Sequence, residues 1–354
     1  METSTQNPLA GTSTTATPRI SRLGSDRPVT GNAEAPQGLT VAVRNVHRSF
    51  GEIQALNDLT IEVPTGRITV LLGPNGAGKT TAIRTITGAL APHEGTVRVF
   101  GVDPLEHGDD VRSRCGVVSA NPALYDRLSG WHNLDYAADL YQVSGDKEAK
   151  IRSAAARFGI EHALDQPVGG YSTGMKTRLA LSRSVLHEPE LLLFDEPTSG
   201  LDPESAHAVL ALIREMTANG TTVVMCTHHL AEAEGLADRI VMLDGGTDLI
   251  GGAPADLTGR FWPQAIVEIH CDEAGAIEAV REMPGVISTT VTDDALGAEV
   301  RLDDQARTPD LIAALTNAGA RITKVEPFEP SLEDLYFAVR QEARDNGILE
   351  EEAA

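Results

Sequence analysis

The fold of this chain is decided by the glycine-rich sequence LGPNGAGKTT, which runs from Leu72 to Thr81. It follows the apolar run Ile68–Leu71 and precedes a segment, residues 80–90, that we expect to be helical. Strand, glycine-rich turn and helix start, in this order, are the context of a phosphate-binding loop. The glycines let the backbone curl so that successive N–H groups face phosphate oxygens, and the helix start adds its positive dipole end. The stretch therefore predicts a nucleoside triphosphate site, against the alternative of a chance glycine-rich turn.

The residue types in this loop also predict individual roles. Lys79 would reach the β- and γ-phosphates, and the Thr80 hydroxyl would coordinate Mg²⁺. The other loop residues that we expect around the nucleotide are Gly73, Pro74, Asn75, Gly76, Ala77, Gly78 and Thr81.

Length and composition limit the possible classes of protein. The 354 residues allow two to three domains, and the formal net charge is −22. An acidic chain repels nucleic acids and anionic lipid headgroups, so we expect no nucleic-acid partner. No apolar run approaches the roughly 20 residues of a spanning helix, and the N-terminus lacks a signal pattern. The three cysteines are scattered, which predicts reduced thiols in a cytosolic protein.

Changes in composition predict the domain organisation. Residues 1–38 are rich in Ser, Thr, Pro and Gly, which predicts a disordered tail. We expect a nucleotide-binding domain over 39–258, with a helical subdomain at about 122–187. A smaller α+β accessory domain is expected over 264–342, followed by an acidic, solvated tail over 343–354.

The accessory domain is predicted to contain six elements in the order βαββαβ. The expected strands are 265–270, 286–292, 298–302 and 321–327, and the expected helices are 274–283 and 309–318. This order suggests a small ferredoxin-like sandwich. A final helix places an apolar stripe at Leu332, Leu335, Tyr336 and Val339, a spacing that normally packs in a core. The domain shows no catalytic constellation, so we expect it to serve in an interaction or to brace a dimer.

Two further polar clusters follow apolar strands. Asp195 and Glu196 end the run 191–194, where buried carboxylates are costly unless a cation or partner is present. In open α/β sheets ligands bind at that strand end. Asp195 therefore fits a Mg²⁺-organising carboxylate, and Glu196 fits a general base for the attacking water. A strand over 221–226 precedes His228, which is either a solvated loop residue or a donor to the γ-phosphate.

Two weaker signals keep alternatives open when taken alone. Phe50 lies between two expected strands and is either core filler or a platform for an adenine ring. The glycine loop 169–175 contains Ser172, which is placed to cap the following helix. By residue type alone, that loop could be a helix cap and nothing more.

Together these motifs resemble those of ABC-transporter ATP-binding subunits, over about Leu39 to Leu257. They occur in the family's order: Walker A at 73–81, signature at 171–175, Walker B at 191–195, D-loop at 199–202, then the switch His228. The resemblance implies an α/β P-loop NTPase fold that hydrolyses ATP with Mg²⁺. It implies a head-to-tail dimer, with each ATP between one subunit's Walker A and the other's signature loop. The implied contact and catalytic residues outside Walker A are Phe50, Ser172, Thr173, Gly174, Asp195, Glu196, Asp202 and His228.

One position departs from the family pattern. Family members usually carry Gln near Ala120, where it contacts Mg²⁺ and the attacking water. A methyl group cannot coordinate a metal, and the shorter Asn121 is the available substitute. The signature also has Thr173 where glycine is commonest.

The C-terminal segment resembles that of daunorubicin-resistance-type drug-export ATPases, including Leu-Glu-Asp-Leu at 332–335. This implies the motor subunit of an exporter, working as a homodimer or with a paired ATPase subunit. A separate transmembrane permease would hold it at the cytoplasmic face of the membrane, docking near the loop 119–122 and the helices that begin near Trp131.

One alternative is a soluble ABC ATPase acting on nucleic acid or ribosomes. Those typically carry two cassettes in tandem or a coiled-coil insertion, which are missing from this sequence. Another is a switch that scarcely hydrolyses ATP, which Ala120 favours and Glu196 and His228 oppose.

Overall fold

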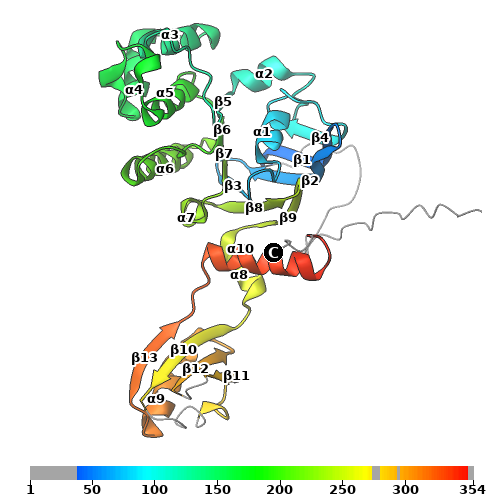
Figure 1. Ribbon diagram of the computed structural model, residues 1–354, viewed down its shortest axis with the longest axis vertical. Coiled ribbons are helices and arrows are strands. Elements are labelled where there is room, and N and C mark those ends of the chain that lie inside the picture. Colours follow the sequence, from blue (N-terminus) through cyan, green and yellow to red (C-terminus); the bar gives the residue numbers. More distant parts are fainter. Residues whose placement is uncertain (1–37, 273–279, 293–295, 350–354) are drawn as a thin grey trace, which may run out of the picture.

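The computed structural model describes residues 38–272, 280–292 and 296–349. Figure 1 shows two parts that are joined by two crossings of the chain, one before strand β10 and one after strand β13. The upper part holds the glycine-rich loop, and the lower part is a small four-stranded sheet with one helix. The predicted N-terminal tail lies outside the described residues except for Gly38.

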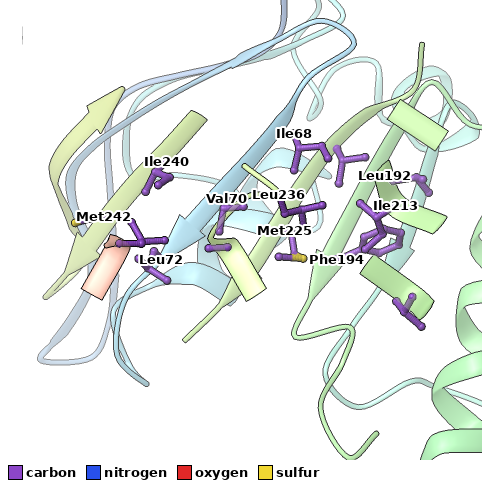
Figure 2. Close-up of a cluster of buried hydrophobic side chains, with 14 of the residues drawn as sticks. Ile68, Val70, Leu72, Leu192, Phe194, Ile213, Met225, Leu236, Ile240 and Met242 are labelled. Atoms are coloured by element: carbon purple, nitrogen blue, oxygen red, sulfur yellow. The ribbon is translucent and has the colours of Figure 1, made fainter. Parts of the chain in front are cut away.

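The upper part is organised around a six-stranded sheet in the order β5-β6-β7-β3-β8-β9, parallel except for β9. β3, β6 and β7 are buried at every position, because helices or the second sheet cover both of their faces. Figure 2 shows Val70, Phe194, Met225 and Ile240 from four adjacent strands in one apolar core. The predicted α/β class is confirmed. The strands are β3 Ile68–Leu72, β5 Cys115–Val118, β6 Leu191–Asp195, β7 Thr222–Thr227, β8 Arg239–Asp244 and β9 Thr247–Gly252.

A three-stranded antiparallel sheet lies against this core. Its order is β2-β1-β4, formed by β1 Leu39–Phe50, β2 Ile53–Pro64 and β4 Glu94–Val99. Helix α1, Lys79–Ile86, follows the glycine-rich loop and contacts both sheets. It is shorter than the predicted 80–90, because Thr87 is its C-cap and Gly88 takes a left-handed φ of +69°.

A helical subdomain lies beside the parallel sheet. It has its own apolar core, in which Leu134, Ile151 and Leu179 are fully buried. Ser172 caps α5 as predicted, since its Oγ accepts from the Met175 N–H at 3.2 Å. The helices of this subdomain are α3 Gly130–Leu140, α4 Lys147–Arg157 and α5 Thr173–Val185. The other helices described in the upper part are α2 Gly108–Ser113, α6 Pro203–Ala218 and α7 Leu230–Ala233.

The lower part is an antiparallel sheet in the order β11-β12-β10-β13. Its members are β10 Ala265–Cys271, β11 Val286–Val291, β12 Gly297–Leu302, β13 Ile322–Pro327 and the covering helix α9 Thr308–Asn317. The predicted helix 274–283 falls largely on residues outside the described ranges. The ferredoxin-like description therefore stays a prediction, while four strands and one helix are found where the pattern placed them.

The final helix, α10 Leu332–Asp345, packs in a core, as the spacing of its apolar stripe predicts. Its apolar stripe is occupied within the chain, because it packs on α7, α8 Pro254–Phe261 and β9 of the upper part (Figure 1). Four of its residues are buried in that core: Leu332, Leu335, Val339 and Ala343. The helix therefore packs on the upper part of the molecule, and a role of the C-terminal segment in bracing a dimer stays a prediction. The helix runs to Asp345, two residues beyond the predicted start of the tail, and Ile348 and Leu349 also pack on this core.

This packing predicts a clear difference in stability between two neighbouring residues of α10. Leu335 is fully buried and Phe337 is 59% exposed. Leu335→Ala should lower the free energy of unfolding by about 2–5 kcal/mol, because it leaves a cavity in the core. Phe337→Ala should change it by less than about 1 kcal/mol. Urea denaturation of both variants measures the difference, and equal destabilisation would refute the assigned packing.

Candidate active site

The glycine-rich loop leaves β3 and turns tightly into α1. A Cβ on Gly73 would lie 2.1 Å from the Leu243 carbonyl oxygen, so only glycine fits there. Gly78 adopts a φ of +97°, and a Cβ on it would lie 2.7 Å from the Ala55 oxygen. Both glycines are therefore needed for the loop to close against its neighbours.

Lys79 is buried beneath this loop. Its ammonium group donates to the Gly73 carbonyl at 2.6 Å and to the Pro74 carbonyl at 3.0 Å. The lysine thus lies at the floor of the loop with its charge held by backbone dipoles. A phosphate in the loop would meet this cation directly.

The loop lines a cavity of about 380 Å³ together with the ends of neighbouring strands. Asp195, at the end of β6, accepts a 2.6 Å hydrogen bond from the Thr80 hydroxyl at the start of α1. The sheet therefore brings together the hydroxyl and the carboxylate that the sequence assigned to Mg²⁺. The predicted site residues that line this cavity are Asn75, Gly76, Ala77, Gly78, Lys79, Thr80, Thr81, Asp195 and Glu196.

Glu196, which lines the cavity of the glycine-rich loop, forms a pair with His228. His228 Nδ1 lies 2.7 Å from Glu196 Oε1, and both side chains are partly exposed. Glu196 has a φ of +54°, a left-handed conformation that is uncommon for a residue other than glycine. Such strain persists only where the surroundings hold it, and it occurs often at functional sites. Here it accompanies the abrupt turn that follows β6.

Glu232, on α7, is a residue that sequence reasoning missed. Its carboxylate accepts from the Thr198 hydroxyl at 2.7 Å and from the Thr227 hydroxyl at 2.9 Å. Thr198 follows Glu196 by two residues, and Thr227 directly precedes His228. One carboxylate thus ties together the two segments that present the Glu196–His228 pair. No local pattern marked it, because its partners lie on two other elements.

The signature loop lies apart from the glycine-rich loop within one chain. Ser172, Thr173 and Gly174 line a second cavity together with Gly200 and Asp202 of the predicted D-loop. Asp202 caps α6, accepting from the Ser205 N–H at 2.9 Å, and these hydrogen bonds with Ser205 lower the pKa of its carboxyl. No predicted signature residue lines the cavity of the glycine-rich loop.

Three weaker assignments are placed as follows. Phe50 is 46% exposed and lies under the Arg48 guanidinium, so it is not core filler. It does not line the cavity of the glycine-rich loop, whereas Ile53 does. Ala120 lines that cavity. Asn121 is exposed and does not line it, and its carbonyl accepts from the Ser119 hydroxyl.

The glycine-rich loop, the strand-end carboxylates and the capped signature loop on a parallel α/β sheet define an ATP-binding cassette. The family model "ABC transporter" matches residues 56–199, and the model "ATP-binding protein DrrA1-3-like, C-terminal domain" matches residues 252–339. The chain belongs to the family of ABC transporter ATP-binding proteins. It is an ATP-binding subunit of this family, whose ATPase domain hydrolyses ATP to power transport.

Individual relatives agree with this assignment. The daunorubicin/doxorubicin resistance ATP-binding protein DrrA of Streptomyces peucetius is 33% identical over 311 residues, which cover 86% of this chain and 93% of that protein. The Nod factor export ATP-binding protein I of Rhizobium etli is 31% identical, and the match covers 83% of this chain and 90% of that protein. A solved ATP-binding subunit of an ABC transporter is 30% identical with a TM-score of 0.59, covering 63% of this chain and 93% of that one.

The two hydrogen bonds of Glu232 predict a catalytic effect at a distance. Glu232→Ala should lower ATP turnover about tenfold with little change in ATP affinity, because the Glu196–His228 pair loses its support. Steady-state kinetics with separate binding measurements check this. Glu204→Ala, an exposed carboxylate on α6, is the matched control. An unchanged kcat in Glu232→Ala would contradict the positioning role.

The cavity lining also predicts the effect of restoring an amide. Ala120→Gln should raise ATP turnover or alter its metal dependence, because a side-chain amide would then reach the cavity. Asn121→Ala should leave turnover unchanged, since its side chain lies outside. Turnover measured with Mg²⁺ and Mn²⁺ tests both variants, and loss of activity in Asn121→Ala alone would show that Asn121 supplies the amide instead.

Proposed function

We propose that this chain is the motor subunit of an ABC exporter, and that two copies close head to tail around two ATP molecules. The observation that carries this proposal is the division of the ATP machinery into two cavities of one chain. One cavity holds Lys79 and the strand-end carboxylates, and the other holds the signature loop. A second subunit in a symmetric arrangement would supply the missing signature loop to each site.

The residues present fit a Mg²⁺ ion with ATP. Thr80 and Asp195 offer two oxygen ligands, and Mg²⁺ commonly takes its other ligands from phosphates and water. The described residues contain no cluster of three or more metal-ligating side chains, which such a site does not need. Lys79 and the loop N–H groups would bind phosphate oxygens. Glu196 would accept the proton of the attacking water, and His228 would orient Glu196 and reach the γ-phosphate.

The permease is proposed to dock on the helical subdomain beside the nucleotide site. No helix in the described ranges is long and apolar enough to cross a membrane. Four large apolar side chains are exposed on α3 and the loop before it: Tyr125, Leu128, Tyr136 and Leu140. Tyr125 and Tyr136 contact each other edge to face at 5.5 Å. Tyr136 and Leu140 lie one helical turn apart on α3, and exposed apolar side chains on one face of a helix are consistent with a protein interface. The subunit would thus be held peripherally at the cytoplasmic face.

Relatives suggest the kind of cargo. The names of the matched proteins refer to daunorubicin resistance and to Nod factor export. Both names concern organic molecules, so we propose export of such a compound through the separate permease.

Membrane recruitment tests this function. The membrane protein that co-purifies with the subunit is identified by mass spectrometry and then co-expressed with it. The subunit should sediment with membranes only when the permease is present, and transport substrate should stimulate its ATPase activity. Leu140→Asp should abolish sedimentation and keep basal ATPase activity, whereas Ile287→Asp, exposed on β11, should change neither. Tight binding to pure lipid vesicles, or specific binding to DNA or ribosomes, would contradict the proposal.

A further inference from the structure

The lower part contains a cavity of about 600 Å³ that plays no role in the ATP site. Its lining includes one residue from each of the two chain crossings that Figure 1 shows between the parts of the molecule. Trp262 follows α8 at one crossing, and Phe328 follows β13 at the other. A backbone hydrogen bond from Phe328 N–H to the Ile266 carbonyl, 2.8 Å long, joins the residue after β13 to strand β10 beside the cavity. The volume falls in the range of small-molecule sites.

Aromatic and aliphatic side chains form one wall of this cavity. The rings of Trp262 and Phe328 meet edge to face with centroids 6.0 Å apart. Ile266 of β10 lines the same wall and is 8% exposed. Such a wall offers apolar contact and the negative ring faces that attract organic cations.

Carboxylates line the cavity beside these apolar side chains, on the sheet face that also carries Ile266, in an unusual arrangement. Glu268 of β10 lies directly opposite Glu299 of β12 on one side and Glu326 of β13 on the other. Like charges directly opposite each other in an antiparallel sheet are destabilising. A row of three glutamates across three strands therefore suggests a function beyond sheet stability. Glu329 adds a fourth carboxylate to the lining.

The cations on this face only partly balance these charges. Lys324 pairs with Glu326 at 2.6 Å and with Glu268 at 3.0 Å, and Arg301 pairs with Glu299 at 3.0 Å. His270 Nε2 also lies 2.9 Å from Glu268 Oε1, and this imidazole adds a positive charge only when it is protonated. Within the described part of the chain, Glu329 has no ion pair. Four carboxylates thus meet two permanent cations, which leaves negative charge next to the aromatic wall.

From this juxtaposition we propose that the cavity binds an amphipathic organic cation. The positive group would lie against the glutamate row and Glu329, and the apolar body would contact Trp262 and Phe328. The Arg301 guanidinium would attract an anionic ligand only weakly, because it is already paired with the Glu299 carboxylate. The ligand would contact both crossings at once, so the site lies where the two parts of the molecule meet. This binding does not depend on the proposed transport function.

Tetraphenylphosphonium and tetraphenylborate form a matched pair of probes, nearly identical in shape and opposite in charge. The chain has two tryptophans, so Trp131→Phe leaves Trp262 as the sole indole fluorophore. In this full-length variant, tetraphenylphosphonium should quench the fluorescence saturably and should bind at least tenfold more tightly than tetraphenylborate. Saturating ATP with Mg²⁺ should not displace it, because the ATP cavity is separate. No saturable quenching, or equal binding of the anion, would refute the proposal.

Charge-removing variants then locate the site. Glu326→Gln with Glu329→Gln should weaken tetraphenylphosphonium binding about fivefold or more, since two carboxylates lose their attraction. Glu106→Gln with Glu282→Gln removes the same charge from exposed positions outside the cavity lining and should leave affinity unchanged. Isothermal titration calorimetry of Trp262→Leu provides a measurement independent of fluorescence, and it should show a similar loss. If both double variants weaken tetraphenylphosphonium binding equally, the general surface charge explains the binding, and the assigned site is wrong.

Discussion

Glu196→Gln should lower ATP turnover by a factor of about 100 to 10 000 and leave ATP binding intact. Glutamine has the shape of glutamate but cannot accept the proton of the attacking water. Because the role proposed for Glu196 lies mainly in the chemical step, the loss should fall on kcat and not on affinity. Single-turnover hydrolysis and equilibrium binding of a fluorescent ATP analogue separate these two quantities.

A matched control uses a carboxylate of the same kind outside the site. Glu204→Gln, on the exposed side of α6, should hydrolyse ATP at the wild-type rate. His228→Ala should also lower kcat, because it removes the 2.7 Å contact with the Glu196 carboxylate. Wild-type turnover in Glu196→Gln would show that another group is the base.

Lys79→Ala should lower ATP affinity and ATP turnover together, unlike Glu196→Gln, which should lower turnover alone. The ammonium group lies at the floor of the loop, bonded to two loop carbonyls, where phosphate oxygens would meet it. Charge-assisted hydrogen bonds contribute about 1.5–3 kcal/mol each, so ATP affinity should fall about tenfold to a hundredfold.

Lys150→Ala is the matched control for this loss of charge. Lys150 forms a surface ion pair with Glu188 at 2.9 Å, and its removal should leave both binding and turnover unchanged. Nucleotide titrations of the two variants make the comparison. If Lys79→Ala binds ATP as tightly as the wild type, the loop does not hold the phosphates as assigned.

The parts of the fold that the sequence predicted well are those with local signals. The apolar run before Leu72 and the glycines after it identify the loop, because each constraint acts within a few residues. The end of an apolar strand at Asp195 likewise predicts which edge of the sheet carries the carboxylates. The cap at Ser172 needs only the next helical turn. Such features follow from spacing alone.

The features that were missed depend on contacts between distant elements. The stripe on α10 correctly indicated burial, but periodicity does not say against which surface a helix packs. Glu232 acts through two hydroxyls on other elements, so no spacing marked it. The glutamate row required the strand register, which places Glu268 opposite Glu299 and Glu326. These are consequences of tertiary pairing, for which a single sequence carries little signal.

The claim that each ATP site is completed by the signature loop of a second subunit has one direct test. The molecular mass of Glu196→Gln is measured by light scattering with and without ATP. With ATP it should double, and adding Ser172→Arg should keep the protein monomeric while its ATP binding stays intact. If Glu196→Gln stays monomeric with bound ATP, or if Ser172→Arg dimerises equally well, the account of the site is contradicted.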